Sequence, residues 1–176
     1  MTSGPALAAL LLTASLALPG AGAGAGELEV YQGPEQPLLA SLPDTSGRER
    51  SLGDYQGQVL LVNFWASWCG PCIGEIPSLR TLRERLDDEP FEVLAINVEE
   101  NPFKVQKFTG LVSMPFPILL DRDRALFEAW GARVLPTSYL LDAAGKVRYR
   151  AQGPLDWSSE DIVDKVRSLL PDDDGP

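Results

Sequence analysis

Short apolar runs alternate with amphipathic stretches along this chain. The first strong run covers residues 58–65, where Leu60, Val62 and Phe64 point to one face of a strand and the residues between them point to the other. An apolar run with both faces hydrophobic is typical of a central strand that is covered on both sides. We therefore expect this strand near the middle of a sheet.

A helix and a second strand follow. Between residues 73 and 86 the apolar positions recur every three or four residues, which predicts a helix of about four turns ending near Asp87. Pro77 lies inside this helix and should kink it, because proline removes one backbone donor. The apolar run 91–98 completes a strand-helix-strand unit, whose crossover should be right-handed.

The rest of the chain continues this alternation. A mixed sheet with helices on both faces is the expected α/β architecture. The remaining expected elements are a hairpin of 38–42 with 48–52, helices over 101–110 and 122–130, strands over 118–120, 138–141 and 146–151, and a last amphipathic helix after Ser158.

The N-terminal segment has the pattern of an export signal. Residues 6–18 are almost entirely apolar, and a Gly/Ala-rich stretch follows with small-residue cleavage sites at 21–23 or 23–25. We expect residues 1–25 to be a signal peptide, with an uncleaved N-terminal membrane anchor as the alternative. We then expect a linker over 26–37, one domain over 38–170 and an acidic tail over 171–176.

Composition narrows the partners. The 176 residues carry a formal net charge of −10 and no basic run, so nucleic acid and anionic lipid are poor partners. An export signal implies a periplasmic or other extracytoplasmic compartment, which is oxidising. A lone Cys-x-x-Cys motif there becomes a disulfide unless something reduces it, so a redox partner is expected.

The candidate chemistry lies directly after the first strong strand. Cys69 and Cys72 are the only cysteines in the chain, and they stand between that strand and the helix. The first sulfur is thereby placed at a helix N-terminus, where free N–H groups and the helix dipole favour a nucleophilic thiolate. The second sulfur is about one turn away and can resolve a mixed disulfide.

Three other interpretations of the cysteine pair are weaker. A structural disulfide closing so short a loop would stabilise the fold little. Structural zinc needs four ligands, and the chain has no histidine and no other cysteine. Buried core thiols do not explain Trp68 and Pro71, which form a turn and an exposed aromatic rim.

These residues resemble a known family. The sequence W-A-S-W-C-G-P-C, with Pro77 five residues after Cys72 and Leu135-Pro136-Thr137 downstream, closely resembles thioredoxins. The region 38–170 is similar to the exported TlpA/ResA-type thioredoxin-like disulfide reductases of bacteria, which share the N-F-W sequence, Glu75, the segment F-P-I-L-L-D and an inserted helix. The resemblance implies a thioredoxin-like three-layer sandwich with an N-terminal hairpin.

The resemblance also implies roles for individual residues. Cys69 would be the attacking nucleophile and Cys72 the resolving thiol. Pro136 would correspond to a cis-proline loop beside the disulfide, where Leu135 can pair with an extended substrate strand. The substrate-binding residues would then be Trp68, Gly70, Pro71, Leu135, Pro136 and Thr137.

Asn63 departs from cytosolic thioredoxin, which has a buried carboxylate at the matching position. An amide cannot exchange a proton at neutral pH, so Asn63 cannot deprotonate Cys72. Glu75 is the candidate replacement, because partial burial beside the disulfide would raise its pKa toward the working range. The alternative is a solvated glutamate that the helix dipole favours.

The resemblance thus implies an exported thiol:disulfide oxidoreductase that reduces protein disulfides, including those of apocytochrome c, and is re-reduced by a membrane electron donor. We expect a monomer without metal or soluble cofactor, the redox-active group being the Cys69–Cys72 disulfide. A disulfide oxidase or isomerase would use the same residues, and a redox-inert binding module would need neither cysteine. A peroxiredoxin is disfavoured because its Thr-x-x-Cys pattern is absent.

Overall fold

The computed structural model describes residues 1, 26–36 and 40–171. Within them the chain forms one mixed sheet of six strands in the order β1-β8-β7-β4-β5-β6. Strands β4, β5 and β6 are parallel, whereas β7, β8 and β1 are added antiparallel. The strands are β1 (Glu29–Val30), β4 (Val59–Trp65), β5 (Phe91–Val98), β6 (Ile118–Asp121), β7 (Thr137–Leu141) and β8 (Val147–Gln152).

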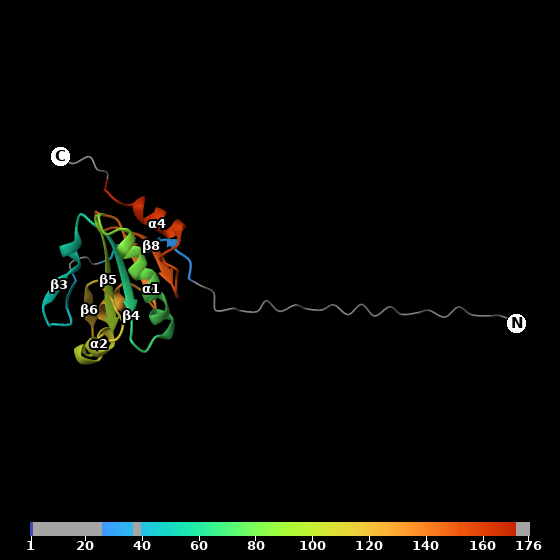
Figure 1. Ribbon diagram of the computed structural model, residues 1–176. Coiled ribbons are helices and arrows are strands. Elements are labelled where there is room, and N and C mark those ends of the chain that lie inside the picture. The colour runs from blue at the N-terminus through green and yellow to red at the C-terminus, as the bar shows by residue number, and fades with distance from the viewer. Residues whose placement is uncertain (2–25, 37–39, 172–176) are drawn as a thin grey trace.

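Helices cover both faces of this sheet, which confirms the expected three-layer α/β fold (Figure 1). Leu79 of α1 and Val163 of α4 belong to the core on one face, and Phe127 of α3 belongs to the core on the other. The helices are α1 (Gly70–Arg85), α2 (Pro102–Thr109), α3 (Ala125–Ala129) and α4 (Glu160–Arg167).

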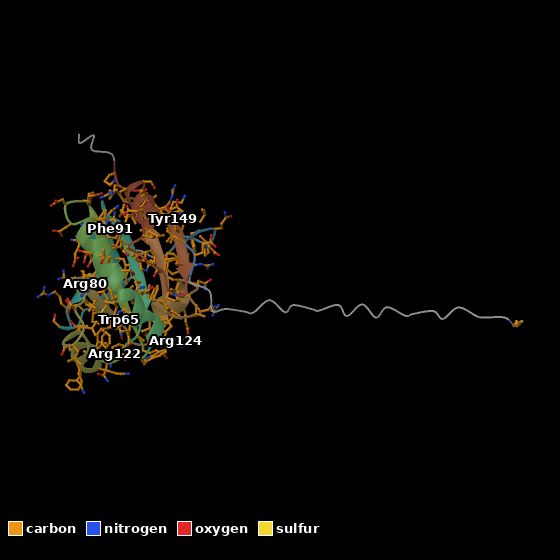
Figure 2. All side chains as sticks on the ribbon, turned by 45° about the vertical axis from the view of Figure 1, so that its right-hand side comes forward. Trp65, Arg80, Phe91, Arg122, Arg124 and Tyr149 are labelled. Carbon is orange, nitrogen blue, oxygen red and sulfur yellow. A yellow bond between two sulfur atoms is a disulfide. The ribbon has the colours of Figure 1, made fainter. Side chains whose placement is uncertain are left out.

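Strand β4 separates the two cores. All seven of its residues are buried, and Phe64 packs with the α3 side while Trp65 packs with the α1 side. The strand ends at Trp65, at the opposite end of the sheet from Phe91, where β5 begins (Figure 2). The turn after Trp65 therefore lies at the carboxyl edge of the parallel strands, where open α/β sheets carry their sites.

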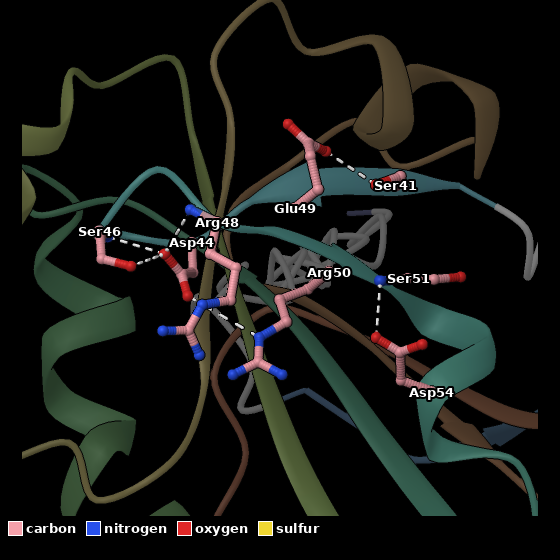
Figure 3. A network of polar contacts seen from close by, with 8 residues as sticks. All are labelled: Ser41, Asp44, Ser46, Arg48, Glu49, Arg50, Ser51 and Asp54. Atoms are coloured by element: carbon pink, nitrogen blue, oxygen red, sulfur yellow. Dashed lines mark hydrogen bonds and ion pairs between the residues drawn. The ribbon is translucent and has the colours of Figure 1, made fainter.

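The expected N-terminal hairpin is present and polar. It consists of β2 (Ser41–Pro43) and β3 (Glu49–Ser51), followed by the 3-10 helix η1 (Leu52–Tyr55). Asp44 closes the turn by accepting hydrogen bonds from the backbone N–H groups of Ser46 at 2.8 Å and Arg48 at 3.0 Å (Figure 3). This is the local bonding that makes aspartate a turn residue.

The structure refines one expectation about the elements and corrects another. Within the segment 26–37, expected as a linker or extended lead-in, Glu29–Val30 forms strand β1 and pairs with Arg150 and Tyr149 of β8 at the edge of the sheet. The expected helix 122–130 begins only at Ala125, because Arg124 has a left-handed backbone with φ of 63°.

The expected signal segment over 1–25 and most of the expected tail lie outside the described residues. In the part of the chain that the structure describes, no helix is both long enough and apolar enough to span a bilayer.

Candidate active site

The two cysteines stand at the start of α1. Cys69 caps the helix and is bonded to Cys72, with their Cα atoms 5.3 Å apart. The backbone N–H of Cys72 also donates to Sγ of Cys69 at 3.3 Å. Cys69 is 5% exposed and Cys72 1% exposed, so Cys69 is the more accessible residue of the two. After reduction, this helix N-terminus would stabilise negative charge on Cys69.

A buried carboxylate lies one turn further along the same helix. Glu75 is only 3% exposed and stands three residues after Cys72, which places both side chains on one face of α1. One carboxylate oxygen, Oε1, accepts from Nδ2 of Asn63 at 2.7 Å. The other, Oε2, accepts from the indole Nε1 of Trp157 at 3.2 Å and from the backbone N–H of Leu155 at 3.3 Å.

Burial dominates the ionisation of this carboxyl group. It raises the pKa of Glu75 to about 7, although the hydrogen bonds from Asn63, Leu155 and Trp157 favour the charged form. A group with a pKa near 7 can both accept and release a proton at neutral pH. The solvated-glutamate alternative is therefore wrong for this structure, and the catalytic role of Glu75 stays a prediction.

The amide of Asn63 holds this carboxylate in place. Asn63 is on β4, and its Nδ2 also donates to Oγ of Ser138 on β7 at 2.9 Å. Both bonds lie in the interior, since Asn63 and Ser138 are each 2% exposed. Strands β4 and β7 thus fix the orientation of Glu75 on α1.

An open groove of about 430 Å³ lies beside the first cysteine, and we call it the disulfide groove. The side chain of Trp68 is 61% exposed at its rim, and that of Val134 is 49% exposed. Its lining includes Trp68, Cys69, Gly70, Pro71, Val134 and Leu135. Four of the expected substrate-contact residues, Trp68, Gly70, Pro71 and Leu135, are thus brought together around Cys69.

The other two expected contact residues are not among the residues that line the groove. The Leu135–Pro136 peptide bond is cis, the geometry that the resemblance implies, but Pro136 is buried. Thr137 is 0% exposed, and its hydroxyl donates to the carbonyl of Val134 at 2.7 Å. The side chain of Thr137 thus holds the loop, and a contact between Thr137 and substrate stays a prediction.

A second hollow, of about 740 Å³, lies between α1 and the segment after β8. Pro71, Gly74 and Glu75 contribute to it from the helix, and Pro154 and Leu155 contribute from the segment after β8. Glu75 therefore lies between the interior of the protein and an accessible, mostly apolar surface.

Sequence reasoning missed a buried network that holds the turn before Cys69. Glu100 is 4% exposed and accepts from the backbone N–H of Ser67 at 2.6 Å, from the Ser67 hydroxyl at 2.7 Å, and from Nδ2 of Asn97 at 2.8 Å. Nζ of Lys104, on α2, is 2.7 Å from the same carboxylate.

These bonds decide the charge of Glu100. Burial by itself raises the pKa of this carboxyl, but the hydrogen bonds from Asn97, Lys104 and Ser67 outweigh it and hold the pKa below its usual range. The four-residue spacing of Glu100 and Lys104 could have suggested their ion pair. No local pattern connects Glu100 with Ser67, 33 residues earlier.

Comparison with known proteins gives a consistent result. The Redoxin family matches residues 32–166. The thiol-disulfide oxidoreductase ResA of Geobacillus thermodenitrificans is 38% identical over 130 residues, which are 74% of each chain. ResA of Bacillus subtilis is 33% identical over 123 residues, covering 70% of this chain and 68% of that protein.

Solved structures agree with these sequence matches. A protein from Chlorobium tepidum, described as a thiol:disulfide interchange protein DsbE, superposes with a TM-score of 0.70 at 27% identity. The match covers 81% of this chain and 98% of that one.

Proposed function

The chain belongs to the Redoxin family as a ResA-like thiol-disulfide oxidoreductase, and on that basis we propose that it works as a reductant of disulfides in exported proteins. The observation that carries this proposal is the Cys69–Cys72 pair at the start of α1, in which Sγ of Cys69, the more exposed residue, accepts the N–H of Cys72. Reduction of a client would start from the dithiol form.

The proposed reaction is a pair of thiol-disulfide exchanges. The Cys69 thiolate attacks one sulfur of the client disulfide, and the client's other sulfur leaves as a thiolate that takes up a proton. Cys72 then loses its proton and attacks Sγ of Cys69, which releases the second client thiol. Two electrons pass from the dithiol to the client, and the Cys69–Cys72 disulfide forms.

In this scheme Glu75 receives the proton from Cys72. Its pKa of about 7 suits that task, and its position one turn after Cys72 on the same helix supports it. Asn63 positions the carboxylate and takes no proton itself, because an amide does not titrate near neutral pH.

The disulfide groove would receive the client. The backbone N–H and C=O of Leu135 make no hydrogen bond to another backbone group within the described residues, so an extended client segment can pair with them. Trp68 would cover the apolar part of that segment.

The cell context is part of the same proposal. We place the protein outside the cytoplasm, exported by or anchored through residues 1–25, and regenerated by a membrane electron donor. Apocytochrome c cysteines are one client class that the family resemblance supports.

A trapping experiment tests this function. The Cys72→Ser variant, expressed in the native host, should accumulate clients as mixed disulfides on Cys69 that mass spectrometry identifies after release with a reductant. The matched control is the double variant Cys69→Ser/Cys72→Ser, which has no attacking thiol. Equal recovery of partners from both variants, or none from either, would count against a reductase.

The direction of transfer is tested by the reduction potential. Equilibration of the wild-type protein in glutathione buffers should give a value near the reducing end of the range, about −270 mV as in thioredoxin. A value near about −120 mV would instead assign the protein to the disulfide oxidants.

A further inference from the structure

The disulfide groove carries charge of the opposite sign to the whole chain. Its charged lining residues are Glu99, Arg124 and Arg133, whereas the chain has a formal net charge of −10. Arg124 lies at the same end of the molecule as Trp65, which marks the carboxyl end of β4 (Figure 2). A positive groove on an acidic protein is a local feature that the overall composition does not predict.

Arg124 is already neutralised by its neighbours. Its guanidinium is 3.3 Å from a carboxylate oxygen of Glu99 and 3.7 Å from one of Glu128, and it lies 5.2 Å from the centre of the Phe127 ring. Arg124 is therefore already paired with carboxylates of its own surroundings, and within the groove its charge and that of Glu99 offset each other.

Arg133 is different, because its charge faces the groove without compensation. It is exposed, and it makes no ion pair with any residue that the structure describes. The backbone is nevertheless fixed by hydrogen bonds at the residue before Arg133 and at the residue after it. The N–H of Ala132 donates to the carbonyl of Phe127 at 3.1 Å, and the carbonyl of Val134 accepts from Thr137. A free cation is thus presented from a fixed loop two residues before Leu135.

The range of electrostatic forces makes this local charge the relevant one for a bound client. At physiological ionic strength the Debye length is about 8 Å, so distant acidic residues are largely screened. A client residue in the groove is within reach of Arg133, while most of the net negative charge is further away. Charge complementarity of this kind mainly sets which partner binds and how fast.

We propose that Arg133 selects client disulfides that carry an acidic residue within about two positions of the attacked cysteine. This inference rests on the proposed reductase function and names the substrate class of that same site. The occupant of the groove is an extended client segment whose cysteine meets Cys69, whose apolar neighbour contacts Trp68 or Val134, and whose carboxylate pairs with Arg133.

The test uses peptide disulfides that differ in one residue. Each peptide is linked to a fluorescent thiol and carries Glu, Gln or Lys two positions before or two positions after its cysteine. The second-order rate of reduction by the dithiol form of the full chain is measured at low and at physiological salt. At physiological salt, where the distant acidic residues are screened, the Glu peptide of the preferred series should react about fivefold faster than the Lys peptide, as an exposed ion pair allows.

Variants of Arg133 distinguish a preference among peptides from a change in the reactivity of Cys69 toward all of them. Arg133→Glu should reverse the preference, and Arg133→Gln should abolish it. The matched control is Lys146→Glu, which makes the same change of charge at an exposed residue that forms no ion pair among the described residues. Lys146 precedes β8 at the far end of β7 from the groove, so its variant should keep the wild-type preference.

The outcomes are distinguishable. Equal rates for Glu, Gln and Lys peptides in both series would overturn the role of Arg133 while leaving the reductase function intact. An Arg133→Glu variant that slows all peptides by one common factor would also overturn it, because that result describes the reactivity of Cys69. A wild-type protein that reduces none of the peptides would overturn both proposals.

Discussion

The side-chain amide of Asn63 donates a 2.7 Å hydrogen bond to the carboxylate of Glu75, and this bond joins the central strand to the redox-active helix. The two residues are 12 positions apart in sequence and both are buried. A neutral donor at this point allows the carboxylate to change its charge without a second titrating group in contact with it.

The Asn63→Asp substitution tests that relationship. Two carboxylates in contact resist joint ionisation, so the pKa of Glu75 should rise further above 7. The free energy of unfolding should fall by about 3 kcal/mol at pH 8 and by less at pH 5, where one carboxyl keeps its proton. Urea unfolding at the two pH values measures this. A loss of stability that is the same at both pH values would contradict the contact.

Glu75→Gln should change how stability depends on pH. The folded pKa of about 7 is above the ordinary value of 4.5, so the folded state binds the proton more tightly than the unfolded state. Stability from this group is then complete below about pH 4.5 and is lost as the pH rises to about 7, by about 3 kcal/mol in total.

The measurement is a pair of unfolding curves. The difference in unfolding free energy between wild type and Glu75→Gln, followed from pH 4 to pH 8, should shift in favour of the variant across that window. The buried Asp121, whose pKa burial also raises, is present in both proteins and cancels. If the unfolding free energies of the two proteins changed in parallel with pH, Glu75 would not have a raised pKa in the folded state.

The same substitution should slow the resolving step. With no proton acceptor beside Cys72, the rate of mixed-disulfide resolution at pH 7 should fall by about 10²-fold, and its pH profile should lose the break near pH 7. Stopped-flow fluorescence of a preformed Cys69 mixed disulfide follows this step. Glu84→Gln, on the exposed surface of the same helix, is the matched control and should leave the profile unchanged.

Glu100→Ala should loosen the turn that precedes Cys69. It leaves the donors of Ser67 and Asn97 without their acceptor, which should lower the unfolding free energy by about 3 kcal/mol. Lys104→Met removes only the half-exposed partner of the ion pair and should cost about 1 kcal/mol or less. Chemical denaturation compares the two variants, and equal losses would mean that the network has no special role.

Trp68→Ala should weaken the reaction with client proteins while leaving the stability of the fold almost unchanged. Because the ring is mostly exposed, the unfolding free energy should change by less than about 0.5 kcal/mol, while kcat/KM for a protein disulfide should fall by about fivefold. Trp65→Ala provides the contrast, since that ring is 1% exposed and its loss should cost about 3 to 5 kcal/mol. An unchanged kcat/KM in Trp68→Ala would remove this residue from the client surface.

The sequence was most informative where a pattern is local. The apolar run of β4 and the Cys-x-x-Cys motif before an amphipathic helix were sufficient to predict the central strand, its two buried faces and the position of the disulfide. The strand over 91–98 was predicted with both ends correct, because six of its eight residues are apolar and all but Glu92 are buried.

Contacts between distant segments were beyond the sequence. Strand β1 has two residues, too few for any period to show, and it exists because β8 offers a free edge. The indole bond from Trp157 to Glu75 spans 82 positions, and the bond from Ser67 to Glu100 spans 33. Such hydrogen bonds form only when the chain is packed in three dimensions. The spacing of residues along the sequence therefore does not predict them.

The attachment of Gly26 has a practical consequence for labelling and tagging. Its backbone N–H donates to the carbonyl of Pro154 at 2.6 Å, and Pro154 lines the hollow beside Glu75. The end of α4 is instead tied to the opposite end of the sheet, where Arg167 pairs with Glu89 just before β5. A bulky fusion partner joined directly before Gly26 would therefore crowd the redox end of the molecule, whereas a reporter group on the exposed face of α4 would leave it open.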